Sequence, residues 1–251
     1  MSGHSKWSSI KHKKGAADAK RGKLFSKLSR AIIVAAREGG PDPLNNLALQ
    51  NAIEKARSFS MPKDTIERAI AKGAGEGTDG AGFETVVYEG YGPEGVAVLV
   101  EALTDNRNRT ASDVRHVFSK HGGNLGATGA VAWQFERRGL IVIAADGVDE
   151  DELVLAAADA GADDVARDDD TFEVSSPPEQ LASVREALEQ AGYAIESAGL
   201  SMVPKTTVAV ADEAVAKKIV RLVESLEDSD DVQDVYANFD IPSEVLEAVA
   251  S

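Results

Sequence analysis

The sequence predicts an α+β protein of three domains. Three observations support this fold class: helical apolar periodicity up to about residue 73, a change to strand-like alternation after a glycine-rich stretch, and a β-α-β-β-α-β order between residues 139 and 203. That last order is the ferredoxin-like arrangement, which is complete in itself and can be inserted into another domain. The predicted domains are residues 1–80, residues 81–137 with 205–251, and the insertion 138–204.

The first domain is predicted to be a bundle of three helices. The first helix starts near Asp18 and ends at Gly39-Gly40-Pro41, because glycine and proline favour the end of a helix. Its apolar side chains share one side of a helical wheel: Leu24, Phe25, Leu28, Ile32, Ala35 and Ala36. A second helix covers Leu49 to Ala56. A third has Pro62 near its first turn and Gly73 as its predicted stop.

Residues 73–82, GAGEGTDGAG, have the glycine density of a phosphate-binding loop, but no strand precedes them and no Gly-Lys-Ser/Thr follows. We therefore expect a hinge. Strands over 85–91 and 95–103 should form a hairpin, followed by a helix over 111–120. Thr110 and Asp113 form a capping-box pattern for that helix, and Gly122-Gly123 should close it. Residues 130–135 are predicted to be a strand.

The inserted domain is predicted from strands at 140–144, 164–167, 171–174 and 194–202 with helices at 150–160 and 179–190. The chain should then return to the second domain. A helix over 208–226 and a strand over 232–239 would cover and extend the sheet that begins at Thr85.

Composition excludes several classes of protein. The chain has no cysteine, so it has no disulfide, no thiolate metal ligand and no cysteine nucleophile. The longest apolar run near the N-terminus is Ala31 to Ala36, too short for a membrane span or a signal peptide. We expect a soluble cytoplasmic protein. A mitochondrial presequence is the alternative, although the basic residues before position 20 are Lys and His rather than Arg.

Charge is distributed unevenly along the chain. The net charge is −15, yet residues 1–80 hold 15 Lys and Arg against 8 Asp and Glu, and residues 81–251 hold 12 against 34. This asymmetry would orient a polyanion toward the N-terminal part. The alternative is a solvated basic tail beside acidic domains.

A dense basic segment near the N-terminus is the first candidate site. Because clustered cations repel one another and release counterions when they bind phosphate, the segment predicts nucleic-acid binding. Trp7 would stack on a base or ribose, or else dock with Ile10 on the bundle. The candidate residues are Lys6, Trp7, Lys11, His12, Lys13, Lys14, Lys20, Arg21, Lys23, Lys27 and Arg30.

A polar turn before the helix over 111–120 is the second candidate. Arginines beside a helix N-terminus oppose the helix dipole, so we expect an anion there, bound by guanidinium groups and backbone N–H groups. The alternative is intramolecular ion pairs with acids such as Glu101 or Asp113. The candidate residues are Asn106, Arg107, Arg109, Arg115 and Lys120.

The sequence predicts no catalytic residues, no metal site and no cofactor. The acidic runs at 149–152 and 168–170 fall at a predicted helix start and in a hairpin turn, where acids have structural roles. The four histidines lack the spacing of a zinc motif, and no GxSxG or Walker motif occurs. We expect a protein that is not an enzyme and has no small-molecule substrate.

Three long strings resemble the YebC/PmpR family of probable transcriptional regulators: GHSKWSSIKHKKGAADAKRGKLFSKLSR, SMPKDTIERAI and EGYGPEGVAVLVEALTDNRNRTASDVRHVFSKHGGNLG. The resemblance implies a helical domain and two α+β domains, the third inserted in the second. Because it begins at Gly3, it implies no presequence and a bacterial cytoplasmic protein. Ala48 and Gln50 stand where we expect arginines in the family, which puts a nucleic-acid role for the second helix in doubt.

Two functions from the resemblance stay open beside an unrecognised enzyme. The first is a DNA-binding transcriptional regulator, and the second is a translation factor that binds ribosomal RNA, as mitochondrial relatives are described as translational activators. No helix-turn-helix pattern supports base readout. The sequence predicts no oligomeric state.

Overall fold

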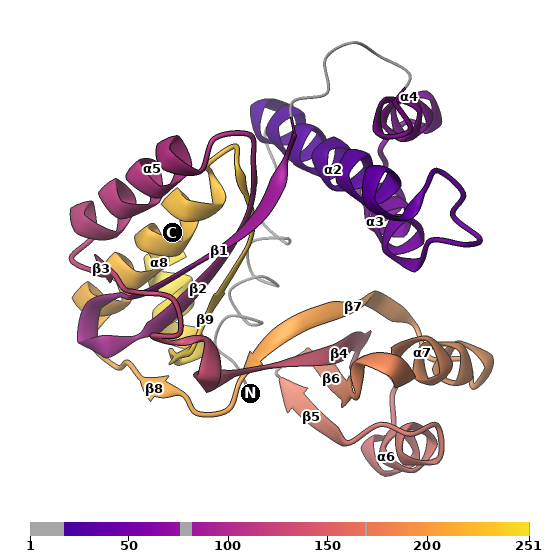
Figure 1. Ribbon diagram of the computed structural model, residues 1–251. Coiled ribbons are helices and arrows are strands. Elements are labelled where there is room, and N and C mark those ends of the chain that lie inside the picture. Colours follow the sequence, from indigo (N-terminus) through magenta and orange to yellow (C-terminus); the bar gives the residue numbers. More distant parts are fainter. Residues whose placement is uncertain (1–17, 76–81, 169, 251) are drawn as a thin grey trace.

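The structure is a computed structural model that describes residues 18–75, 82–168 and 170–250 (Figure 1). Its N-terminal part is the predicted bundle of three helices: α2 (Asp18–Gly39), α3 (Leu47–Ser58) and α4 (Lys63–Gly73). Ile32, Leu49 and Ile66 fill its core and are almost fully buried. The apolar stripe of the first helix is therefore the surface against which the other two helices pack.

Asn46 holds the turn between α2 and α3. Its side-chain oxygen accepts a hydrogen bond from the Leu49 N–H at 3.0 Å and so caps α3, while its amide donates to the carbonyls of Ala35 and Gly40 at 2.7 and 2.8 Å. Gly40 has a φ of +88°, a conformation that favours glycine. The predicted end of the first helix is confirmed.

Helix α4 ends at Gly73, as predicted, and this glycine also has a packing role. It is the last residue of the helix, and a Cβ there would lie 2.6 Å from the Ile33 carbonyl oxygen and 2.7 Å from the Ala36 Cβ. The left-handed conformation belongs to Gly75, with φ +93°. Gly73 thus allows the close packing of α4 on α2, and Gly75 provides the left-handed conformation just after the helix end.

The second part is an antiparallel sheet of order β3-β1-β2-β9. The predicted hairpin consists of β1 (Glu84–Tyr91) and β2 (Ala97–Thr104), joined by a short 3-10 helix at Pro93–Gly95. The edges are β3 (Asn124–Leu125) on β1 and β9 (Val232–Ala237) on β2. The predicted return of the chain to this sheet is confirmed.

Helices α5 (Arg107–Lys120), α8 (Glu213–Glu227) and α9 (Ser243–Ala250) pack on one face of this sheet. Val100, Phe118 and Leu222 lie in the resulting core with almost no exposure. The predicted helix over 208–226 starts too early, because Val208–Ala209 forms β8, which pairs in parallel with β10 (Phe239–Asp240). Asp212 caps α8 instead, accepting from the Val215 N–H at 2.9 Å.

The third part has the predicted β-α-β-β-α-β order. It comprises β4 (Phe135–Ala144), α6 (Glu150–Asp159), β5 (Asp164–Asp168), β6 (Thr171–Ser176), a 3-10 turn at Pro178–Gln180, α7 (Leu181–Gln190) and β7 (Ile195–Pro204). The strand order is β5-β6-β4-β7, with all neighbours antiparallel. Asp149 caps α6 through the Glu152 N–H at 3.1 Å, which is the structural role expected of the first acidic run.

The predicted strand over 130–135 is wrong. Residues Ala132–Gln134 form a 3-10 helix, and the strand begins at Phe135. The Glu89 carboxylate accepts hydrogen bonds from the backbone N–H groups of Gly129, Val131 and Ala132, at 2.6, 2.8 and 2.7 Å. A distant side chain thus takes the donors that a strand would have given to a neighbouring strand.

Ion pairs connect the three parts. Lys55 on α3 lies 3.0 Å from the Asp234 carboxylate on β9, and Arg185 on α7 lies 3.2 Å from the Glu54 carboxylate on α3. These partners are half-exposed, so each pair contributes little energy and mainly orients the parts.

In the described part of the chain, no helix is both long enough and apolar enough to cross a bilayer.

Candidate nucleic-acid interface

The turn before α5 supplies the residue that caps the start of this helix. Asn106 is the N-cap, and its side-chain oxygen accepts from the Arg109 N–H at 3.1 Å. The predicted capping box at Thr110 and Asp113 is therefore wrong, and the helix starts at Arg107 rather than Ala111. Thr110 is buried inside the first turn, where its hydroxyl is 2.7 Å from the Asp231 carboxylate.

Both arginines of this turn are engaged by acids of the same chain. The Arg109 guanidinium contacts the carboxylates of Asp105 at 2.8 Å and Asp231 at 2.9 Å, and Arg107 lies 3.6 Å from Glu84. The alternative of intramolecular ion pairs is what the structure shows, with acids other than those expected. Arg107 and Arg109 keep about two thirds and half of their side-chain surface exposed, so each can still meet an external anion.

Asp231 is the centre of this network of polar contacts. Its carboxylate accepts from Arg109 and Thr110 of α5 and from Arg30 of α2, the last at 3.0 Å. Burial alone would raise the pKa of Asp231, but the hydrogen bonds from Arg109 and Thr110 and the charges of Arg109 and Arg30 lower it below its ordinary value. The sequence analysis missed Asp231, because it is one acid among several and its partners are far away in the chain.

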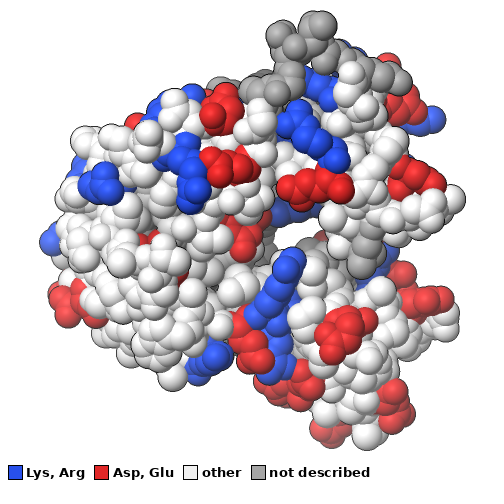
Figure 2. Space-filling view, viewed as in Figure 1, with Lys and Arg blue, Asp and Glu red and all other residues white. Residues whose placement is uncertain are grey.

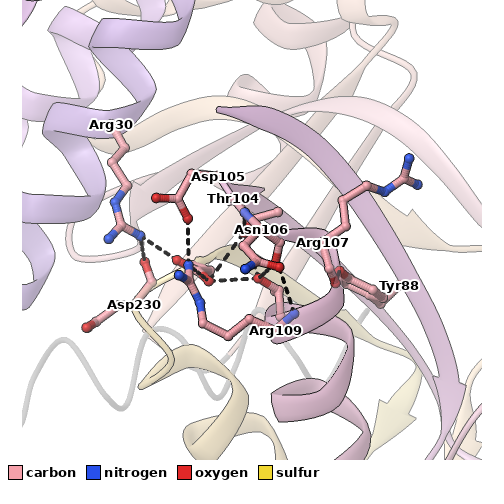
Figure 3. A network of polar contacts seen from close by, with 10 residues as sticks. Arg30, Tyr88, Thr104, Asp105, Asn106, Arg107, Arg109 and Asp230 are labelled. Atoms are coloured by element: carbon pink, nitrogen blue, oxygen red, sulfur yellow. Dashed lines mark hydrogen bonds and ion pairs between the residues drawn. The ribbon is translucent and has the colours of Figure 1, made fainter. Parts of the chain in front are cut away.

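The cations of α2 converge on the C-terminal end of α8 and the residues that follow it. The Lys23 ammonium lies 3.4 Å from the Asp228 carbonyl oxygen, Lys27 donates to the Glu227 carbonyl, and Arg30 donates to the Asp230 carbonyl as well as to Asp231. The last carbonyls of a helix lack intrahelical partners and carry partial negative charge, so cations are favourable there. Figure 3 shows Arg30 reaching from α2 toward Asp230.

These contacts give Lys23, Lys27 and Arg30 a role in holding the bundle against the helix-covered sheet. Part of their hydrogen-bonding capacity is therefore already used within the molecule. The backbone of Lys20 and Arg21 is part of α2. Six of the predicted contact residues lie outside the described part of the chain: Lys6, Trp7, Lys11, His12, Lys13 and Lys14.

The outer face of α5 carries the remaining predicted residues. Arg115 and Lys120 are exposed, and neither makes an ion pair within the described residues. His121, directly after α5, places its Nε2 3.0 Å from the Ser225 hydroxyl of α8. Burial and the positive charges of Lys120 and Arg221 lower the pKa of His121, so the ring is neutral at pH 7.

Two other features bear on the chemistry of the described residues. No group of three or more His, Asp or Glu side chains among them is arranged to hold a metal ion.

A cleft of about 150 Å³ lies where β2 and β9 approach β4 and β7, lined by Glu101, Arg137, Met202, Asp234 and Tyr236. Burial and the neighbouring Asp234 raise the pKa of Glu101 there.

Two family models match this chain. Residues 5–76 match the model of the TACO1/YebC protein N-terminal domain, and residues 83–239 match that of the TACO1/YebC second and third domain. Proteins of Rubrobacter xylanophilus and Syntrophobacter fumaroxidans, each named probable transcriptional regulatory protein, are both 57% identical over 250 residues and covered completely by the alignment.

A solved structure supports the same assignment. The crystal structure of a conserved hypothetical protein from Aquifex aeolicus is 54% identical, with a TM-score of 0.80, and the match covers 90% of this chain and 92% of that one. These matches confirm the family resemblance that the sequence motifs indicated. The chain belongs to the TACO1/YebC family.

Proposed function

We propose that this protein is a regulator that binds nucleic acid, without enzymatic activity, and that its partner is DNA at regulated genes. The observation that carries the proposal is the concentration of Lys and Arg in the first 80 residues of a chain whose remainder is strongly acidic. Such a distribution directs a polyanion to one part of the molecule and keeps it away from the rest. The names of the bacterial relatives support a role in transcription.

The α5 turn supplies a second place for phosphate contact. Arg107, Arg109, Arg115 and Lys120 expose their charged groups along one helix, and the first-turn N–H groups of that helix add partial positive charge. Of these, Arg115 and Lys120 have no ion-pair partner among the described residues to give up on binding. Phosphate contacts position a nucleic acid and do not read its sequence, so we expect weak sequence preference.

Fluorescence anisotropy with labelled duplex DNA over a range of salt concentrations tests the proposal. Binding through several phosphates gives a negative slope of log K against log salt, and replacing Lys11, Lys13 and Lys14 by Ala should reduce that slope by about 2 to 3. The matched control is replacement of Lys63, Arg68 and Lys72 by Ala, which removes the same charge from α4. A flat plot, or an unchanged affinity in the N-terminal variant, would sink the proposal.

A translation factor that binds ribosomal RNA is the second candidate. The same exposed cations favour it equally, because RNA presents the same phosphate groups. Sucrose-gradient sedimentation of a cell lysate separates the two candidates. Co-sedimentation with ribosomes that is lost in the variant of Lys11, Lys13 and Lys14 favours the ribosome, whereas protein that stays at the top of the gradient at low salt excludes it.

A further inference from the structure

Positive charge is concentrated on two neighbouring helices of an otherwise acidic region. Seven of the twelve Lys and Arg residues after position 80 belong to α5 and α8, which together carry four of the thirty-four acids in the same region. The two helices pack side by side on the sheet. Figure 2 shows Lys and Arg side chains over the α5 side of the molecule, while acidic side chains predominate over α6 and α7.

Three of these cations form a compact set that we call the α8 stripe: Lys217, Lys218 and Arg221. All three are exposed, and they lie on the side of α8 opposite its buried residues, with Arg221 one turn after the two lysines. Within the described residues none of them has an ion-pair partner. Lys217 and Arg221 are like charges at positions i and i+4, a spacing that is unfavourable in a helix.

The α8 stripe continues onto α5. Ser225, one turn after Arg221 on the same side of α8, meets the His121 ring at 3.0 Å. Lys120 and Arg221 both lie near enough to that ring for their charges to act on it. The contact between His121 and the Ser225 hydroxyl thus joins α5 to α8, and Lys120 directly precedes His121 in the chain.

We propose that the α8 stripe together with Lys120 is a binding surface for the phosphate backbone of a nucleic acid, separate from the N-terminal basic segment. This inference rests on the proposed function and assigns it a surface that the sequence analysis did not include. Among the described residues its cations have no ion pair to break when they bind, in contrast to Lys27 and Arg30, whose charged groups already have partners at the end of α8 and just after it. Each phosphate that they neutralise releases counterions and contributes to affinity.

The test compares two variants with the same change of charge. Lys217, Lys218 and Arg221 are replaced by Ala in one, and Lys63, Arg68 and Lys72 in the other, in the full chain. Anisotropy with duplex DNA and with a ribosomal RNA fragment is measured against salt. We expect the α8 variant to lose about 2 to 3 units of slope with at least one of the two nucleic acids, and the α4 variant to keep the wild-type slope.

Further outcomes decide the remaining questions. Replacement of Lys217 and Lys218 by Arg keeps the charge and should retain wild-type binding. Equal losses in the α8 and α4 variants would show an effect of net charge only and would overturn the α8 stripe as a site. A wild-type protein that binds neither nucleic acid would instead overturn the proposed function. If the α8 variant loses binding only to phosphatidylserine vesicles, the class of partner is wrong.

Because the three side chains are exposed, the α8 variant should fold normally. Its thermal midpoint should stay close to that of the wild type, because the change removes both a like-charge spacing (Lys217 with Arg221) and opposite-charge spacings (Glu213 with Lys217, Arg221 with Glu224). A cooperative melt by circular dichroism therefore accompanies the binding data, and it ensures that lost binding is read as a lost contact.

Discussion

Asp231 joins side chains that lie far from it in the sequence, with Arg30 separated from it by 201 positions and Thr110 by 121. Replacing Asp231 by Ala would remove the acceptor that two guanidinium groups and a buried hydroxyl share. We expect the free energy of unfolding to fall by about 2–3 kcal/mol, as for hydrogen bonds to a charged group. Urea denaturation measures it.

The neighbouring Asp230 provides a control for this change. Its side chain is exposed, and its contact with Arg30 is made through the backbone carbonyl, which the Asp230→Ala variant keeps. That variant should unfold within about 0.5 kcal/mol of the wild type. Equal destabilisation by both substitutions would contradict the central position of Asp231.

Glu89 is the second buried acid with a specific structural role. It is 4% exposed, and the pKa of its carboxyl is lowered, because three backbone hydrogen bonds outweigh the effect of burial. A lowered pKa means that the carboxylate stabilises the fold above its unfolded value of about 4.3 and loses this contribution as pH falls below it. Glu89→Gln should cost about 2 kcal/mol at pH 7.

The pH profile of unfolding checks the Glu89 prediction. The difference in free energy of unfolding between wild type and Glu89→Gln should be constant from pH 7 to about 5 and then shrink toward pH 3. Glu196→Gln, on the exposed side of β7, should show no such pattern. A difference that does not change with pH would mean that the carboxylate charge is not what holds residues 129–132.

At the scale of single elements, the start of α5 gives a direct test of the revised helix boundary. Asn106→Ala removes the N-cap and should lower the free energy of unfolding by about 1 kcal/mol. Asn108→Ala changes the same residue type two positions later, where the side chain is exposed. Chemical denaturation of both variants decides the boundary, since a larger effect at Asn108 would place the cap elsewhere.

Local patterns predicted most elements because their cause is local. The stripe from Leu24 to Ala36 and the glycines at 122 and 123 are features of neighbouring residues, and the structure confirms the helices that they delimit. The strand predicted at 130–135 failed for a different reason. Its backbone donors are taken by Glu89, some forty residues away, and no local pattern reports such a partner.

The same distinction applies to the candidate site. Cations such as Arg115 and Lys120 are predictable as exposed from their residue type, and they form no ion pair within the described part of the structure. The intramolecular roles of Lys27 and Arg30 are not predictable in that way. Their partners are backbone carbonyls and an acid about 200 positions away, brought to α2 only by the packing of the bundle on the helix-covered sheet.

At the scale of the whole molecule, the contact between the bundle and the helix-covered sheet depends on charge. Replacing Lys27 and Arg30 by Ala removes donors to the segment after α8, so we expect a larger radius of gyration by small-angle X-ray scattering. Raising the salt concentration should produce part of this expansion in the wild type, because salt screens exposed charges. Arg68→Ala, which removes hydrogen bonds to Asp64 and Thr65 of the same helix, should leave the radius unchanged.

Separation of charge along the chain is the basis of the proposed function, and its most direct test is the salt dependence of nucleic-acid binding by the wild-type protein. Affinity for duplex DNA and for ribosomal RNA is measured from low to physiological salt. We predict a linear fall of log K with log salt, with a slope of several units for at least one of the two. An affinity that does not change with salt for either nucleic acid would contradict the account.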